Sequence, residues 1–230
     1  MLKSGKCSLS GLSPDEIVRA GECHKDPGGY FIVKGKERVI ISQIRGTYNV
    51  PMVFSQKPKN GEKFEYVCEV RSMSEETGHS VLVQCMIGLD KRTLVFSLPY
   101  IKNPIPIGVI FKALGYITDE QISDLVGLKT ESMQPYMDLI LRDSFFVDSQ
   151  ERALDHIGAH AKNPLNKAER AKYAWQVLEG ELFPHMGVCS TIKEKAYFVG
   201  HMVHKLMSTH LKMREPDDRD NYVNKRIEPT

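Results

Sequence analysis

The first half of the chain alternates apolar and polar side chains with the period of a β-strand. Residues 63–71 alternate as a half-buried strand does, and β-branched side chains dominate residues 37–45. A turn at Gly35 separates this β-branched run from residues 30–34 and predicts a hairpin. Two further strands are predicted over residues 80–87 and 93–98.

After Pro106 the apolar period becomes helical. Capping boxes at Thr118–Gln121 and Thr191–Glu194 mark two helix starts, and the last helix is expected to stop near Arg214 because Pro216 cannot continue it. The predicted helices cover residues 107–114, 118–126, 134–142, 150–160, 167–182 and 191–214. The fold class is therefore α+β, with a strand-rich N-terminal half that carries a basic hairpin and a helical C-terminal half.

Composition is that of a globular protein, with 41% hydrophobic and 26% charged residues in a chain of 230. The formal net charge is only +2, yet residues 1–63 hold 11 Lys and Arg against 6 Asp and Glu. This asymmetry predicts that an anionic partner lies against the N-terminal part. Five cysteines without a CxxC motif indicate reduced, unpaired thiols in an intracellular protein.

Candidate catalytic and metal-binding residues are sparse. The histidine pairs His156/His160 and His201/His204 have helical spacing, but neither has a nearby Cys or carboxylate set that would complete a metal site. Phosphate-binding and hydrolase motifs such as GxxxxGK[ST] and GxSxG do not occur. We therefore predict no catalytic residue, no metal ligand and no cofactor in this chain, although a small metalloenzyme remains an alternative.

The basic hairpin is the better functional candidate. A two-stranded ribbon that carries Lys34, Lys36, Arg38 and Arg45 can place cations along a phosphodiester backbone. The alternative is a solvated hairpin edge, where Lys discourages pairing with another strand. The residues alone leave both interpretations open.

Four segments resemble one known family. They are residues 26–43, residues 98–115 with the motifs LPYIK, IPI and FKALG, residues 153–158 (ALDHIG) and residues 217–226 with DDRD and KR. In order and spacing they resemble the second-largest, β-like subunit of multisubunit DNA-directed RNA polymerases, essentially from end to end. The glycine doublet Gly28–Gly29 resembles the eukaryotic, archaeal or large-DNA-virus type, and divergence over residues 44–49 points to a virus-encoded polymerase.

The resemblance implies that the chain is a fragment of a nucleotidyltransferase and is itself non-catalytic. Residues 1–51 would be part of the protrusion domain, residues 52–214 the lobe domain, and residues 215–230 the start of the return segment into the protrusion. The hairpin would then lack most of the strands that support it. The whole enzyme of this family uses Mg and structural Zn, and those sites would lie outside this chain.

The resemblance also implies a role and partners. In the family, lobe and protrusion form one wall of the cleft that takes in DNA, the outer face of the lobe docks initiation factors, and the second arm of the hairpin approaches the RNA–DNA hybrid. The implied nucleic-acid-binding residues are Lys34, Lys36, Arg38, Gln43 and Arg45. The implied partners are DNA and nascent RNA, the largest subunit and the other polymerase subunits, and initiation factors, with no membrane. The implied location is the nucleus for a cellular protein, or the host cytoplasm or virion for a viral one.

Structural roles compete with these assignments. Glu37 and Arg38 could pair with each other, and Gln43 could satisfy buried backbone. Residues 98–102 are expected to pack the sheet against the helices, and Arg219 is expected to pair with neighbouring acids. For the chain as a whole, the alternative is a stand-alone protein–protein docking domain that does not bind nucleic acid.

Overall fold

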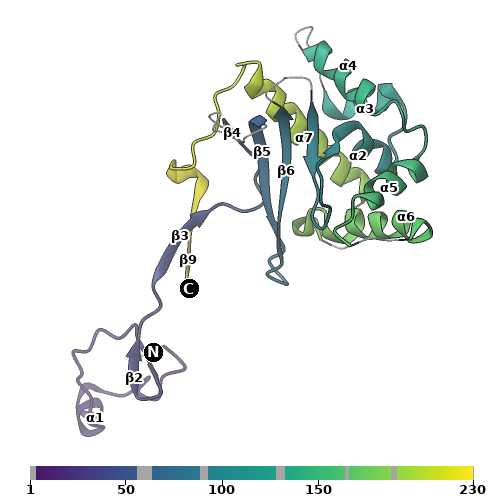
Figure 1. The fold of residues 1–230 in the computed structure, drawn as a ribbon. Helices are drawn as coiled ribbons and strands as arrows, with labels where there is room; N and C mark the ends of the chain where they lie inside the picture. The colour runs from purple at the N-terminus through teal and green to yellow at the C-terminus, as the bar shows by residue number, and fades with distance from the viewer. Residues whose placement is uncertain are drawn as a thin grey trace. The chain divides into compact units, whose positions relative to one another are not determined.

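The structure is a computed structural model that describes residues 4–55, 64–88, 93–127, 133–163, 166–187 and 191–229. The chain divides into two compact units. The smaller unit comprises Met1–Gly46 with Tyr222–Thr230, and the larger comprises Thr47–Asn221. Strands dominate the first half and helices the second (Figure 1), so the predicted α+β class is confirmed.

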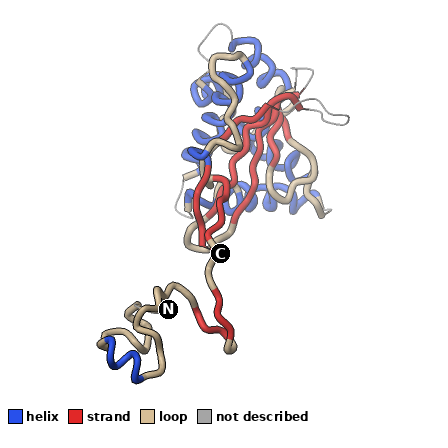
Figure 2. The backbone as a smooth tube through the Cα atoms, turned by 90° about the vertical axis from the view of Figure 1, so that its left-hand side faces the viewer, coloured by secondary structure: helices blue, strands red, loops and turns tan. Residues whose placement is uncertain are grey.

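The larger unit contains one antiparallel sheet whose strands lie in sequence order. The strands are β4 (Met52–Ser55), β5 (Phe64–Met73), β6 (Ser80–Gly88), β7 (Leu94–Ser97) and β8 (Ile105–Pro106). Three of them match the predicted strands to within two residues at each end, whereas β4 and β8 were not predicted. In Figure 2 the red strands of this sheet run beside the blue helices of the same unit.

Helices form the second layer of the larger unit. They are α2 (Ile107–Ala113), α3 (Asp119–Val126), α4 (Gln134–Asp143), α5 (Gln150–Ala159), α6 (Lys167–Gln176) and α7 (Ile192–His210). Thr118 and Thr191 form the predicted capping boxes, because each hydroxyl accepts from the N3 amide while the N3 side chain accepts from the cap amide. α7 contacts β4, β5 and β6, and its buried stripe joins the side chains of the sheet in one hydrophobic core.

Two helix ends differ from the predictions. The helix predicted over residues 167–182 ends as α6 at Gln176 and continues as a π-helical turn, Val177–Glu181. The last helix ends at His210, before the predicted stop near Arg214. Lys212 has a left-handed backbone (φ 59°), and the Met213 amide donates to the Ser208 carbonyl, so a left-handed cap ends the helix ahead of Pro216.

The smaller unit contains α1 (Pro14–Arg19), a short 3-10 turn (Tyr222–Asn224) and two separate two-stranded sheets. One sheet pairs β1 (Phe31–Val33) with β2 (Lys36–Arg38), and the other pairs β3 (Ser42–Gly46) with β9 (Lys225–Pro229). The second arm of the hairpin is therefore not one strand over residues 37–45. Residues 39–41 interrupt it, and its last part pairs with the C-terminal segment (Figure 1).

No described residue of the smaller unit is fully buried. Many of its aliphatic side chains are exposed, and those beside and within the strands are Ile32, Val33, Val39, Ile40, Ile41, Ile44 and Ile227. Hydrophobic side chains are the main source of stability in a fold of this size. The described part of this unit therefore has no hydrophobic core of its own.

Candidate nucleic-acid interface

The β1–β2 hairpin presents three cations to solvent. Its turn residues Lys34 and Gly35 both have positive φ (50° and 71°), the backbone that a two-residue type I′ turn requires. This places Lys34 at the tip, and Lys36 and Arg38 share one face of β2 because they are two residues apart. All three are exposed, and in the described ranges none of them forms an ion pair.

Asp26 holds the chain in place just before β1. One of its carboxylate oxygens accepts from the Gly28 amide at 2.8 Å, and the other accepts from the Tyr30 hydroxyl at 2.6 Å. Gly28 and Gly29 both have positive φ (71° and 87°), which glycine adopts without strain. The hydrogen bond to Asp26 also raises the pKa of Tyr30 to about 12. The Asp-Pro-Gly-Gly-Tyr motif thus fixes where the hairpin begins.

The β3–β9 ribbon carries the other two predicted residues. Gln43 and Arg45 share a face with Glu228 and Arg226, which oppose them in the register. Arg45 Nη2 donates to Gln43 Oε1 at 3.1 Å and its Nε lies 3.7 Å from Glu228, whose other oxygen accepts from Arg226 at 2.8 Å. Glu228 therefore offsets part of the positive charge at Arg45.

All five predicted residues are thus exposed in the smaller unit, divided between its two sheets. The competing structural roles do not apply to two of them. Gln43 accepts from Arg45 at the surface and does not satisfy buried backbone. Glu37 and Arg38 are consecutive in β2, so their side chains point to opposite faces, and no ion pair joins them in the part of the chain that is described.

Sequence reasoning missed Arg226 and Glu228 as members of the β3 face. The tail was expected only as the start of a return segment, and the structure pairs its strand β9 with β3 over five residues. The alternation of residues 225–228 (Lys-Arg-Ile-Glu) is a strand signal, but it is too short to be decisive by itself.

Residues 98–102 and Arg219, both in the larger unit, were expected to have structural roles. Residues 98–102 do join sheet and helices, since Leu98 and Ile101 are buried in the core and Ile101 forms a β-bridge with Ala161 at the end of α5. Arg219 does not pair with its neighbouring acids. Its guanidinium lies 3.1 Å from Glu69 on β5 and stacks 3.9 Å above the Phe54 ring.

One histidine of each pair donates a hydrogen bond to a backbone carbonyl. His160 Nδ1 donates to the His156 carbonyl at 2.9 Å, and His204 Nδ1 donates to the Val126 carbonyl at 3.1 Å. Burial and then His160 lower the pKa of His156, and burial, Lys205 and His204 lower that of His201. Within the described residues, no three His, Cys, Asp or Glu side chains are grouped so that they could hold a metal ion.

The described cysteines are free thiols. Cys68 on β5 and Cys85 on β6 lie opposite each other on these neighbouring strands. Burial raises the pKa of Cys68 to about 12 and that of Cys85 well above its usual value. Such thiols remain protonated at neutral pH and are poor nucleophiles. Cys189 lies outside the described residues.

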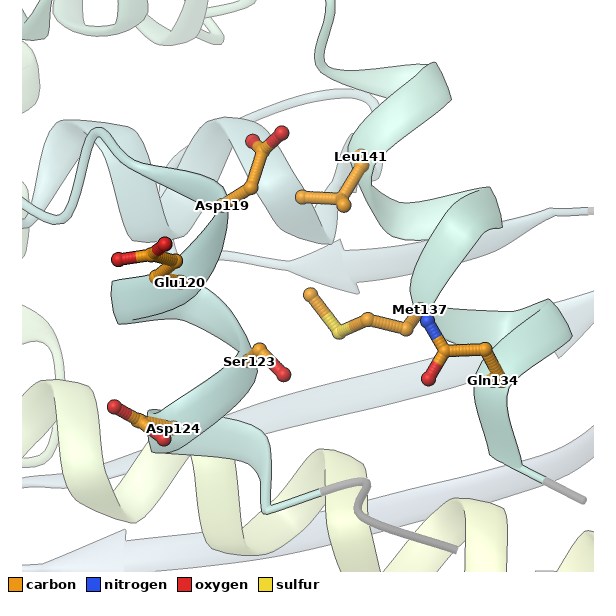
Figure 3. A pocket seen from close by; sticks show the side chains of 7 residues that line it. All are labelled: Asp119, Glu120, Ser123, Asp124, Gln134, Met137 and Leu141. Atoms are coloured by element: carbon orange, nitrogen blue, oxygen red, sulfur yellow. The ribbon is translucent and has the colours of Figure 1, made fainter. Parts of the chain in front are cut away.

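A groove of about 440 Å³ lies between α3 and α4 (Figure 3). Three acidic residues of α3, Asp119, Glu120 and Asp124, are among those that line it, and Met137 and Leu141 of α4 form its apolar wall. In Figure 3 the carboxylates of Glu120 and Asp124 point away from α4. Its negative charge disfavours a phosphate-bearing ligand. The groove is thus opposite in charge to the cationic hairpin.

No helix in the described part of the chain is long and apolar enough to span a membrane.

Comparison with known proteins gives consistent matches. A family model described as RNA polymerase Rpb2, domain 2, matches residues 47–228. DNA-directed RNA polymerase II subunit 2 of Arabidopsis thaliana is 36% identical over 244 residues. The probable RPB2 homologue of Invertebrate iridescent virus 6 and Rpo2 of Sulfolobus acidocaldarius are each 34% identical. Each alignment covers 99% of this chain and 20 to 22% of the relative, so the chain spans about a fifth of their length.

Proposed function

Since this chain belongs to the family of second-largest subunits of DNA-directed RNA polymerases, as its motifs predicted, we propose that it is the lobe and protrusion module of such a subunit. Residues 1–51 and 215–230 would contribute to the protrusion, and residues 52–214 would form the lobe. The module would line part of the DNA cleft of a polymerase during transcription. It would not carry out the chemistry of nucleotide addition.

The hairpin is the observation that carries the nucleic-acid role. Lys34, Lys36 and Arg38 are exposed on a ribbon whose turn and start are fixed, and no described carboxylate neutralises them. Unpaired cations on a preorganised ribbon suit contact with a phosphate backbone. Gln43 and Arg45 would contribute from β3, with Arg45 weakened by Glu228.

The uncovered apolar side chains of the smaller unit support polypeptide partners. Val39, Ile41 and Ile44 are each more than half exposed, and such a surface is normally covered in the working assembly. We assign the covering of these side chains to other parts of the polymerase. The module as a whole would contact the largest subunit and initiation factors. The enzyme would work inside the cell, in the nucleus or, for a viral enzyme, in the host cytoplasm or virion.

The metal ions of a whole polymerase do not fit the described residues of this chain, because these include no cluster of ligands. We therefore assign the Mg and structural Zn of the enzyme to other regions. The alternative of a stand-alone docking domain is not favoured, because the similarity to polymerase subunits covers almost the whole chain.

Salt-dependent binding of labelled duplex DNA to the 230-residue chain tests the proposal. The variant Lys34→Gln/Lys36→Gln/Arg38→Gln is compared with Lys6→Gln/Arg19→Gln/Lys25→Gln, which removes the same charge from exposed positions of the same unit. Each lost phosphate contact lowers the slope of log affinity against log salt by about 0.9. The hairpin variant should lower the slope by about 2 to 3, and the control should leave it unchanged. Equal effects of the two variants would contradict the proposal.

A further inference from the structure

Two loops of the larger unit are joined by a short backbone bridge. Ile101, between β7 and β8, pairs with Ala161 at the end of α5. On either side of this pair, the Lys102 amide donates to the His160 carbonyl at 2.8 Å, and the Lys162 amide donates to the Tyr100 carbonyl at 3.1 Å. These hydrogen bonds fix residues 100–102 and 160–162 against each other.

The bridge separates buried from exposed side chains. Ile101 is only 6% exposed, whereas Tyr100 is 42% exposed and both Lys102 and Lys162 are exposed. Lys162 Nζ lies 6.0 Å from the centre of the Tyr100 ring, and His160 is half-buried beside them. We call Tyr100, Lys102, His160 and Lys162 the bridge patch.

The bridge patch is cationic and has no neutralising carboxylate. Neither lysine forms an ion pair with any residue that the structure describes. The loop residues 98–103 and 159–163 contain no acidic side chain, and each segment ends in an exposed asparagine, Asn103 or Asn163. Two lysines, a tyrosine and two asparagines are thus exposed on two loops that backbone hydrogen bonds hold together.

We propose that the bridge patch is a second phosphate-contacting site, which binds the backbone of duplex DNA independently of the hairpin. This inference rests on the proposed function, which brings DNA to the module. Lysines and neutral donors at fixed positions are the groups that bind phosphodiesters without reading sequence. An acidic protein surface fits less well, because stable protein interfaces need a buried apolar anchor and Tyr100 is the only large exposed apolar side chain of the patch.

The backbone bridge also lowers the cost of binding. The backbone amides of both lysines are already hydrogen-bonded across the two loops. Binding therefore reduces the conformational freedom of the lysine side chains but not that of the backbone. The bridge patch should therefore contribute to affinity although it has few groups.

Duplex DNA binding by the 230-residue chain tests the inference. Lys102→Gln/Lys162→Gln is compared with Lys193→Gln/Lys212→Gln, which removes two exposed lysines at the ends of α7. The bridge variant should lower affinity about tenfold at about 0.1 M salt and reduce the salt slope by about 2, and the α7 variant should change neither. Circular dichroism of each variant checks that the fold is intact.

Three outcomes would overturn the inference. If the bridge variant binds DNA as the wild type does while the hairpin variant does not, the inference fails and the proposed function stands. If the wild type shows no salt-dependent DNA binding, both fail. If the bridge variant loses binding to polyglutamate but not to DNA, the bridge patch is a docking site for acidic protein.

Discussion

Val53 and Asp217, which are 164 residues apart, exchange two hydrogen bonds. The Val53 amide donates to Asp217 Oδ2 at 2.8 Å, and the Asp217 amide donates to the Val53 carbonyl at 2.7 Å. Lys205 Nζ lies 3.5 Å from the same carboxylate, and Arg214 donates to its other oxygen. Asp217, the first residue of the DDRD motif, thus fastens the end of the larger unit to its first strand.

Replacing Asp217 should destabilise the larger unit. Asp217→Ala removes an acceptor from the Val53 amide and leaves Lys205 and Arg214 without their carboxylate. We expect a loss of about 2 to 3 kcal/mol, which urea unfolding would measure. Asp220→Ala, at an exposed position of the same motif, is the control and should change stability by less than about 0.5 kcal/mol. Equal losses for the two variants would contradict the role of Asp217.

Stability should also fall in acid because of the same carboxyl. Burial raises the pKa of Asp217, but the Arg214 hydrogen bond, the Val53 amide and Lys205 outweigh it, so the pKa lies below its usual value. A lowered folded pKa stabilises the protein above the unfolded pKa of about 3.9, and this stabilisation is lost as pH falls through the folded pKa. Unfolding at pH values from about 6 to about 2 should show a smaller acid-dependent loss for Asp217→Asn than for the wild type. An identical pH dependence would refute this assignment.

Gly158 should not tolerate a side chain. A Cβ at this position would overlap the backbone of Arg170, which lies where α5 and α6 cross. Gly158→Ala should therefore cost about 1 to 3 kcal/mol, because the two helices must move apart. Gly180→Ala is the matched control, since a Cβ there meets no atom within 4 Å. Thermal unfolding should separate the two variants, and equal melting temperatures would argue against a close helix crossing.

The buried lysine of the FKALG motif should be a structural group. Lys112 is 7% exposed, and its ammonium donates to the carbonyls of Ser144 and Val147 at 2.8 and 2.7 Å. Lys112→Met keeps the apolar stem but removes the ammonium donor from the Val147 carbonyl and leaves the Ser144 carbonyl with the Val147 amide alone. This loss should cost about 2 to 3 kcal/mol in chemical denaturation. Lys172→Met, at an exposed position of α6, should have little effect. A stable Lys112→Met variant would show that water or other donors replace the ammonium.

Elements with local signals could be predicted from the sequence. The strand β5 follows from the alternation of polar and apolar residues over most of its length, and α3 and α7 start at capping boxes that involve residues only three apart. The pairing of β3 with β9 could not be predicted in this way, because the partner strand lies near the other end of the chain. The predicted single arm over residues 37–45 failed for a related reason. Val39, Ile40 and Ile41 have high strand propensity, but propensity does not specify where pairing changes partner.

The nucleic-acid-binding role of the five predicted residues stays a prediction, and their electrostatic surroundings could not be predicted from the sequence. The cations of the hairpin are visible in the sequence, and their exposure agrees with that prediction. The partial neutralisation of Arg45 depends on Glu228, which only the three-dimensional pairing brings next to it. Lys36 and Arg38 are therefore the stronger candidates for phosphate contact.

Photo-crosslinking in the assembled polymerase that contains this chain tests the central claim most directly. A photoreactive amino acid would replace Arg38 or Arg45 in the smaller unit or, as a control, the exposed Tyr197 on α7. The account predicts crosslinks to DNA or to the RNA–DNA hybrid from positions 38 and 45 and much weaker ones from position 197. Absence of nucleic-acid crosslinks at both 38 and 45, or equal yield from 197, would contradict it.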